Sequence, residues 1–114
     1  MKDITKMLIE FREARDWKQF HSPENLSKSI VIEAAELLEN FQWSKEFNKE
    51  KVVDELADIL IYCVLMADSL EVEVDKIIKE KIVKNNERYP VEKAKGNSRQ
   101  GGLSYPGEAA QKSY

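Results

Sequence analysis

The feature that most constrains the fold is a run of nine uncharged residues, Ile59 to Ala67, with the sequence ILIYCVLMA. The run belongs to a helical pattern that begins after Asn48 and extends to about Leu70. A helix that is apolar on every side is buried on every side. We therefore expect this helix to be central to a bundle or shared between subunits, with the single cysteine, Cys63, as a buried thiol.

Three other segments have apolar residues at helical spacing. Ser22 followed by Pro23 is typical of a helix start, because the hydroxyl accepts a backbone N–H and proline suits the first turn. Asp3 or Thr5 can cap the first helix, and the last should end before Pro90, since the residue preceding proline disfavours helix. The expected helices cover about residues 3–17, 23–42, 49–70 and 73–88.

Short connections between four such helices favour an all-α fold, an antiparallel four-helix bundle. The chain has 114 residues, which suits one domain. All four glycines follow Lys95, in a segment without an apolar period. We expect a helical domain over residues 1–95 and a flexible tail over residues 96–114.

Charge and hydropathy restrict the partners. The net charge is −3 and no dense run of lysine or arginine occurs, so we expect no binding to nucleic acid. No apolar run approaches the ~20 residues of a membrane span. The first residues, MKDITKMLIEF, lack the long apolar stretch of a signal peptide. We expect a cytoplasmic protein with no membrane partner.

Two acidic pairs border the apolar stripes of the second and third helices. Glu33 and Glu36 are three residues apart, and Glu55 and Asp58 repeat this spacing after a gap of 18 residues. Residues three apart share a helical face. If the two helices pack antiparallel, as their short connection favours, the four carboxylates can converge at one edge of the interface. Their mutual repulsion then calls for a cation.

This cluster offers only oxygen ligands, which select Mg²⁺ or Mn²⁺ over zinc. The alternative is a solvated surface, because exposed glutamates commonly occur at this spacing without a ligand. The corresponding alternative function is a non-catalytic helical module for oligomerisation or interaction.

The two pairs, E-x-x-E and E-x-x-D, resemble the signature of the all-α nucleoside triphosphate pyrophosphohydrolases, the MazG-like group. Their flanks resemble the dCTP pyrophosphatase branch, over about Phe11 to Arg99. The segments that carry this resemblance are RDWKQFHSPENL at 15–26, FQW at 41–43, DELADILIY at 54–62, and the run Lys81, Asn85, Arg88, Tyr89 and Pro90.

The resemblance implies cleavage of a dCTP-like nucleoside triphosphate between its α- and β-phosphates, giving the monophosphate and pyrophosphate. It implies that Mg²⁺ is held by Glu33, Glu36, Glu55 and Asp58 and acidifies the attacking water. The proton would pass to a glutamate that is not fully used as a ligand, Glu36 or Glu33. Other anhydride substrates within the same fold are dUTP and phosphoribosyl-ATP.

The same resemblance assigns phosphate contacts to Lys81, Asn85 and Arg88, which are otherwise ordinary solvated residues. Trp17 and Trp43 can stack on the base, or pack in the core as tryptophans often do.

His21, the only histidine, can contact the base or bond a loop carbonyl, and Asn25 can read a base edge or help to cap the second helix. Tyr62 extends the acidic stripe by one turn and completes the substrate-binding candidates. One residue departs from the pattern: Leu8 stands where some dCTP-cleaving members have a histidine. The family also implies a homodimer or homotetramer, with active sites near subunit contacts.

Overall fold

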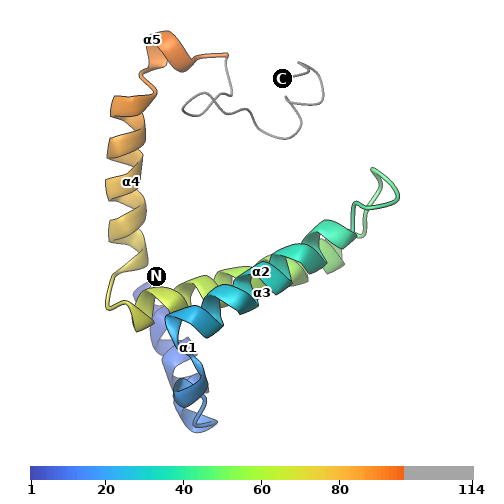
Figure 1. Ribbon diagram of the computed structural model, residues 1–114, viewed down its shortest axis with the longest axis vertical. Coiled ribbons are helices and arrows are strands. Elements are labelled where there is room, and N and C mark those ends of the chain that lie inside the picture. Colours follow the sequence, from blue (N-terminus) through green and yellow to red (C-terminus); the bar gives the residue numbers. More distant parts are fainter. Residues whose placement is uncertain (97–114) are drawn as a thin grey trace. The chain divides into compact units, whose positions relative to one another are not determined.

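The computed structural model describes residues 1–96, and the regular structure in this part of the chain is helical throughout (Figure 1). The long helices are α1 (Lys2–Ala14), α2 (Pro23–Glu39), α3 (Lys49–Ser69) and α4 (Val74–Arg88). A 3-10 helix, η1 (Lys18–Phe20), and a short helix, α5 (Val91–Ala94), complete the list. The predicted all-α class is therefore confirmed. The chain forms two compact units, one of residues Met1–Asp75 and one that begins at Lys76.

Helices α2 and α3 lie side by side as an antiparallel pair (Figure 1). Each begins at a residue whose side chain accepts a free backbone N–H of the first turn. The Ser22 hydroxyl accepts from the N–H of Asn25 at 3.1 Å, and the Asn48 side-chain oxygen accepts from the N–H of Lys51 at 3.3 Å. The predicted cap at Ser22 is confirmed, and α3 begins directly after Asn48 as expected.

The apolar core of the first unit is small. Its buried apolar side chains are Leu26 of α2, which is 1% exposed, and Val64, Leu65 and Ala67 of α3. Helix α1 packs against α3. The first unit is therefore a helical hairpin, α2 and α3, with α1 laid against one of its members.

Helices α1 and α3 end in the same backbone motif. After each, one residue adopts the left-handed conformation, Asp16 with φ 53° and Glu71 with φ 57°. The next N–H then reaches back five residues: Trp17 donates to Arg12 at 3.1 Å and Val72 donates to Ala67 at 3.0 Å. This Schellman pattern usually uses glycine, which adopts positive φ at no steric cost.

The first two helices are shorter than expected. Helix α1 begins after Met1 and has no side-chain cap, so Asp3 and Thr5 lie inside it, and it ends before the turn at Asp16. Helix α2 ends at Glu39, because the Asn40 side chain donates to carbonyl oxygens of the last turn, those of Glu36 and Leu37, at 3.2 Å. Trp43 therefore lies in the α2–α3 loop rather than on a helix.

The uncharged run of α3 is only partly covered. Within the chain Leu60 is 54% exposed, Ile61 is 37% exposed, and Cys63 is exposed. The prediction of a buried Cys63 thiol is wrong for this chain by itself, because α2 and α1 cover only part of the α3 surface within the first unit. That α3 is shared between subunits stays a prediction.

The second unit contains most of α4 together with α5. Helix α4 ends at Arg88, as predicted, since Tyr89 precedes Pro90. Helix α5 follows Pro90 directly and was not predicted. The predicted flexible tail lies, from residue 97 on, outside the described residues. Between residues 1 and 96, no helix has both the length and the apolarity that a membrane crossing requires.

Candidate metal centre

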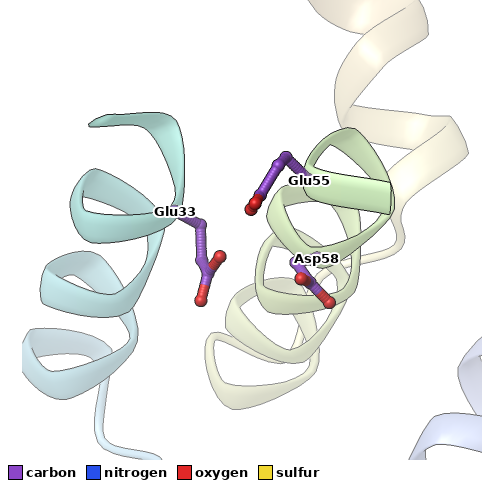
Figure 2. Close-up of side chains that lie close together, drawn as sticks. All are labelled: Glu33, Glu55 and Asp58. Carbon is purple, nitrogen blue, oxygen red and sulfur yellow. The ribbon is translucent and has the colours of Figure 1, made fainter. Parts of the chain in front are cut away.

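Three carboxylates from two helices meet on one side of the α2–α3 pair. Figure 2 shows Glu33 on α2 across from Glu55 and Asp58 on α3. One oxygen from each lies within 4.8 Å of one from each of the others. The convergence follows from the predicted geometry: Glu55 and Asp58 are one helical turn apart, and antiparallel packing brings Glu33 opposite them.

The site gathers several carboxyl groups, and burial and proximity raise the pKa of two of them, Glu33 and Glu55. The pKa of Glu33 is raised from its ordinary value of 4.5 to about 7. Loss of water around this carboxylate is the largest cause, and the adjacent Glu36 and then the charges of Asp58 and Glu55 add to it. The pKa of Glu55 is raised as well, first by burial and then by Glu36. The fold thus holds these carboxylates together although they repel one another.

Among residues 1–96, no lysine or arginine forms an ion pair with these carboxylates. In the described part of the chain, the ion pairs of lysine, arginine and the N-terminal amine go to other acids: Asp75, Glu13, Asp68 and Glu24. The Oε2 atom of Glu33 is buried and has no hydrogen-bond partner. A buried carboxylate oxygen without a donor costs free energy. An all-oxygen donor set with an unpartnered buried atom fits a hard divalent cation.

Glu36, the fourth predicted ligand, lies at the edge of this group. It is exposed and falls outside the three whose oxygens lie within 4.8 Å of one another. It nevertheless contributes to the raised pKa of both Glu33 and Glu55. Glu36 therefore contacts the cluster from its solvent side.

Trp17, His21 and Asn25 lie close together around η1. The rings of Trp17 and His21 meet edge to face, with centroids 6.5 Å apart, and Trp17 also meets Phe11 at 5.6 Å. The Asn25 side-chain amide donates to the carbonyl oxygen of Phe20 at 3.1 Å. Asn25 thus holds the end of η1, and its backbone N–H forms the Ser22 cap.

The Nδ1 atom of His21 is buried and has no partner, so the expected bond from the ring to a loop carbonyl is not formed at this atom. The pKa of His21 is lowered, by burial first and by the charge of Arg12 second. The imidazole is accordingly held in its neutral form near neutral pH.

Trp43 and Tyr62 differ in exposure. Trp43 is 88% exposed in the loop that joins α2 to α3, so it is not a core residue of the chain. Tyr62 is half-buried on α3, one turn beyond Asp58. These positions leave the Trp43 ring free to meet a ligand.

Lys81, Asn85 and Arg88 lie on α4, in the second unit. They are exposed and spaced three or four residues apart, which places them along one side of that helix. The Arg88 guanidinium lies 5.3 Å from the centre of the Tyr89 ring.

One charged group was missed by sequence reasoning. Arg12 of α1 is 4% exposed, and its guanidinium contacts Asp68 of α3 at 2.9 Å and Glu13 at 3.0 Å. A signal for its burial exists, because Arg12 lies four residues after Leu8 on the apolar side of α1. Its partner, 56 residues away, has no comparable signal.

Comparison with known proteins identifies a matching family and similar sequences. The model of the MazG-like family matches residues 28–103. The chain is 36% identical over 108 residues to the dCTP pyrophosphatase 1 of Rattus norvegicus, and 35% identical over 109 residues to that of Homo sapiens. These alignments cover 86% and 87% of this chain, but the chain spans only 64% of the length of each relative.

A solved structure is also similar. A pyrophosphatase from Archaeoglobus fulgidus, known from its crystal structure, matches with a TM-score of 0.74 and 39% sequence identity. The match covers 79% of this chain and 92% of the other. At this identity the likeness extends beyond the fold to the sequence.

Proposed function

Because the chain belongs to the MazG-like family, we propose that it hydrolyses a nucleoside triphosphate between the α- and β-phosphates, releasing the monophosphate and pyrophosphate. The names of its relatives support dCTP or a closely similar nucleotide as the substrate. The observation that carries the proposal is the convergence of Glu33, Glu55 and Asp58, with which no lysine or arginine in the described part of the chain forms an ion pair.

The proposed cofactor is Mg²⁺, for which Mn²⁺ can substitute. Glu33, Glu55 and Asp58 would hold it, and Glu36 would join them from the solvent side. When bound, Mg²⁺ supplies positive charge that neutralises phosphate oxygens and makes water more acidic. It would also lower the pKa of Glu33 by stabilising the ionised carboxylate.

The carboxylate that receives the proton of the water is assigned to Glu36, with Glu33 as the alternative. Glu36 is exposed and adjoins the cluster, so it can reach a water at the edge of the site. In the proposed step the water oxygen bonds to the α-phosphorus while the bond from that phosphorus to the α–β bridging oxygen breaks. Pyrophosphate leaves with the bridging oxygen, and the proton of the water passes to the carboxylate.

The other candidates would bind the nucleotide. Trp17 and Trp43 would stack on the base, and Trp43 is exposed enough to do so. His21, Asn25 and Tyr62 would contact the base and sugar. The exposed side chains of Lys81, Asn85 and Arg88 would bind the phosphates, the lysine as a point charge and the arginine as a fork.

We further propose that the protein is a homodimer or a homotetramer. Leu60 and Ile61 of α3 are substantially exposed, and so are Val31 and Ile32 of α2. Exposed apolar side chains on neighbouring helices are typical of a surface that a partner covers. Light scattering at micromolar concentration tests this proposal, and a stable monomer of 13.2 kDa would contradict it.

The experiment for the activity is pyrophosphate release from a panel of canonical and modified nucleoside triphosphates, with and without Mg²⁺. We expect release that depends on Mg²⁺, is fastest with dCTP or a modified dCTP, and is lost in Glu36→Gln. If no nucleotide yields pyrophosphate and Mg²⁺ does not stabilise the protein, the chain is instead a helical interaction module.

A further inference from the structure

An ion pair between the buried Arg12 and the partly buried Asp68 joins the ends of α1 and α3. The Nη1 atom of Arg12 lies 2.9 Å from the Oδ2 atom of Asp68, while the Nε and Nη2 atoms contact Oε1 of Glu13 at 3.2 and 3.0 Å. The side chain of Arg12 is the most enclosed of the three. Each helix ends in a Schellman motif within four residues of this pair. The contact therefore links two well-defined helix ends rather than two flexible side chains.

The position of Asp68 makes the arginine necessary. Asp68 lies in the last turn of α3, where the helix dipole disfavours a negative charge. Arg12 lies in the last turn of α1, where the dipole favours a positive charge. The pair thus compensates an acid that is unfavourable on its own helix. Removal of Arg12 would leave the partly buried Asp68 carboxylate both unpaired and close to the negative end of the α3 dipole.

The backbone of Arg12 belongs to the turn that follows α1, so anchoring the Arg12 side chain also anchors one end of this turn. Its carbonyl oxygen accepts the N–H groups of Arg15 at 3.2 Å and Trp17 at 3.1 Å. From Trp17 the chain continues directly into η1, where the N–H of Phe20 donates to the carbonyl of Trp17 at 2.9 Å. The N–H of His21 donates to the carbonyl of Lys18 at 3.0 Å. Backbone hydrogen bonds therefore join Arg12 to Trp17, and the turn of η1 that follows directly ends at His21.

The side chains of Arg12 and His21 also line one pocket of about 280 Å³. The other charged residues that line it are Lys18 from η1, Asp68 from α3, and Glu71 from the turn after α3. The His21 ring is fixed on one side by Trp17, and its Nδ1 atom is buried. No charged group in this set contacts His21 through a hydrogen bond, so its orientation depends on the turn that carries it.

We propose that Arg12 is a positioning residue for nucleotide binding: anchored to Asp68, it fixes the turn that presents Trp17 and His21 to the nucleotide. This inference rests on the proposed function, since it assigns the turn to the substrate site. Arg12 would not touch the nucleotide. Its loss would weaken binding of the nucleotide and leave the chemical step at the acid cluster intact.

Three single variants separate geometry from charge. Arg12→Met removes both, Arg12→Lys keeps the charge but cannot form the fork with Asp68 and Glu13, and Asp68→Asn keeps Arg12 but weakens its anchor. For dCTP with Mg²⁺ we expect Arg12→Met and Asp68→Asn to raise KM about tenfold, with kcat within about twofold of the parent. Arg12→Lys should have an intermediate KM.

A second readout uses the single histidine of the chain. NMR titration of its imidazole reports its protonation directly, without turnover. Because the charge of Arg12 lowers the pKa of His21, Arg12→Met should titrate at higher pH than the parent. Arg12→Lys and Asp68→Asn both keep a positive charge at residue 12, so neither should show this rise.

KM and the imidazole titration together test the positioning role of Arg12 even if one single variant does not fold. Far-UV circular dichroism identifies the variants that are folded, and the double variant Arg12→Met with Asp68→Met replaces the pair by apolar side chains of similar volume. A folded double variant with raised KM and a raised imidazole pKa would support the inference. A folded double variant with the KM and the titration of the parent would overturn it.

Failure of the proposed function can be told apart from failure of the positioning role. In that case the parent itself would release no pyrophosphate from any triphosphate. The imidazole titration and the ring proton shifts of His21 and Trp17 would still report whether Arg12 fixes the turn. Unchanged ring shifts in Arg12→Met would then reject the positioning role, whereas altered shifts would retain it for a different ligand.

Discussion

The first unit carries two clusters of charged residues that differ in their balance of charge. In one, Glu33, Glu55 and Asp58 converge with Glu36 at their edge, and no lysine or arginine of residues 1–96 pairs with them. In the other, the buried guanidinium of Arg12 lies between Asp68 and Glu13. Both clusters join α3 to a neighbouring helix, so their structural surroundings are similar.

The difference indicates what each cluster does. A compensated ion pair between helices serves the fold, because each charge satisfies the other. A group of carboxylates without compensation costs stability unless a ligand supplies the missing charge. The unpartnered buried oxygen of Glu33 and its pKa of about 7 both indicate that ionisation of this cluster is unfavourable. We therefore interpret the first cluster as a ligand site and the second as a structural and positioning element.

The largest expected effect is on activity at the uncompensated cluster. Glu55→Gln removes one proposed ligand and should lower kcat/KM for dCTP by roughly a hundredfold or more, without loss of folded structure. The matched control is Glu24→Gln, an exposed acid of α2 that pairs with Lys28 at 3.4 Å. Pyrophosphate release measures both variants. Equal rates in Glu55→Gln and the parent would remove the acid cluster from the mechanism.

The next effect is on stability at the compensated cluster. Arg12→Met leaves the partly buried Asp68 unpaired and should lower the free energy of unfolding by about 2–4 kcal/mol. Urea denaturation measures this change. Replacing both residues by methionine should recover most of the loss, since no charge is then left unpaired. A single variant as stable as the parent would mean that the ion pair contributes nothing to the fold.

The pH dependence of the metal-free protein should distinguish the clusters. Because the pKa of Glu33 is raised in the folded state, that state binds its proton more tightly than the unfolded chain does. The stabilisation is present at low pH and is lost as the pH rises from about 4.5 to about 7. Glu33→Gln should flatten this decline in thermal unfolding measured with a chelator. A decline of unchanged slope in the variant would assign the titration to other groups.

The smallest effect concerns the helix ends beside the ion pair. Glu71 adopts φ 57°, a conformation that favours glycine. Glu71→Gly should raise the free energy of unfolding by about 0.5–1 kcal/mol, because it relieves backbone strain without touching the acid cluster. Denaturant unfolding checks the sign. A loss of stability would show that the Glu71 side chain makes a contribution that outweighs the strain.

The features that were predictable from the sequence are local ones. The caps at Ser22 and Asn48 and the end of α4 before Pro90 depend on neighbours within a few residues. The meeting of Glu33 with Glu55 and Asp58 was also predictable, because the spacing within each helix is short and the connection between the helices dictates antiparallel packing.

What the sequence did not indicate depends on distant or competing contacts. The partner of Arg12 is 56 residues away, so no periodicity identifies it. The second helix was expected to extend to about residue 42, but it ends at Glu39, where the Asn40 side chain bonds carbonyl oxygens of the last turn. Burial of Cys63 was inferred from uncharged neighbours, although exposure depends on which helices are present to cover α3.

The most direct test of the central claim is thermal unfolding at about pH 7.5 with and without excess Mg²⁺, for the parent and for Asp58→Asn. A ligand that binds only the folded state must stabilise it. We predict that Mg²⁺ raises the Tm of the parent by about 5 °C and leaves that of Asp58→Asn unchanged. No change in the parent, or an equal rise in both proteins, would contradict a metal site formed by Glu33, Glu55 and Asp58.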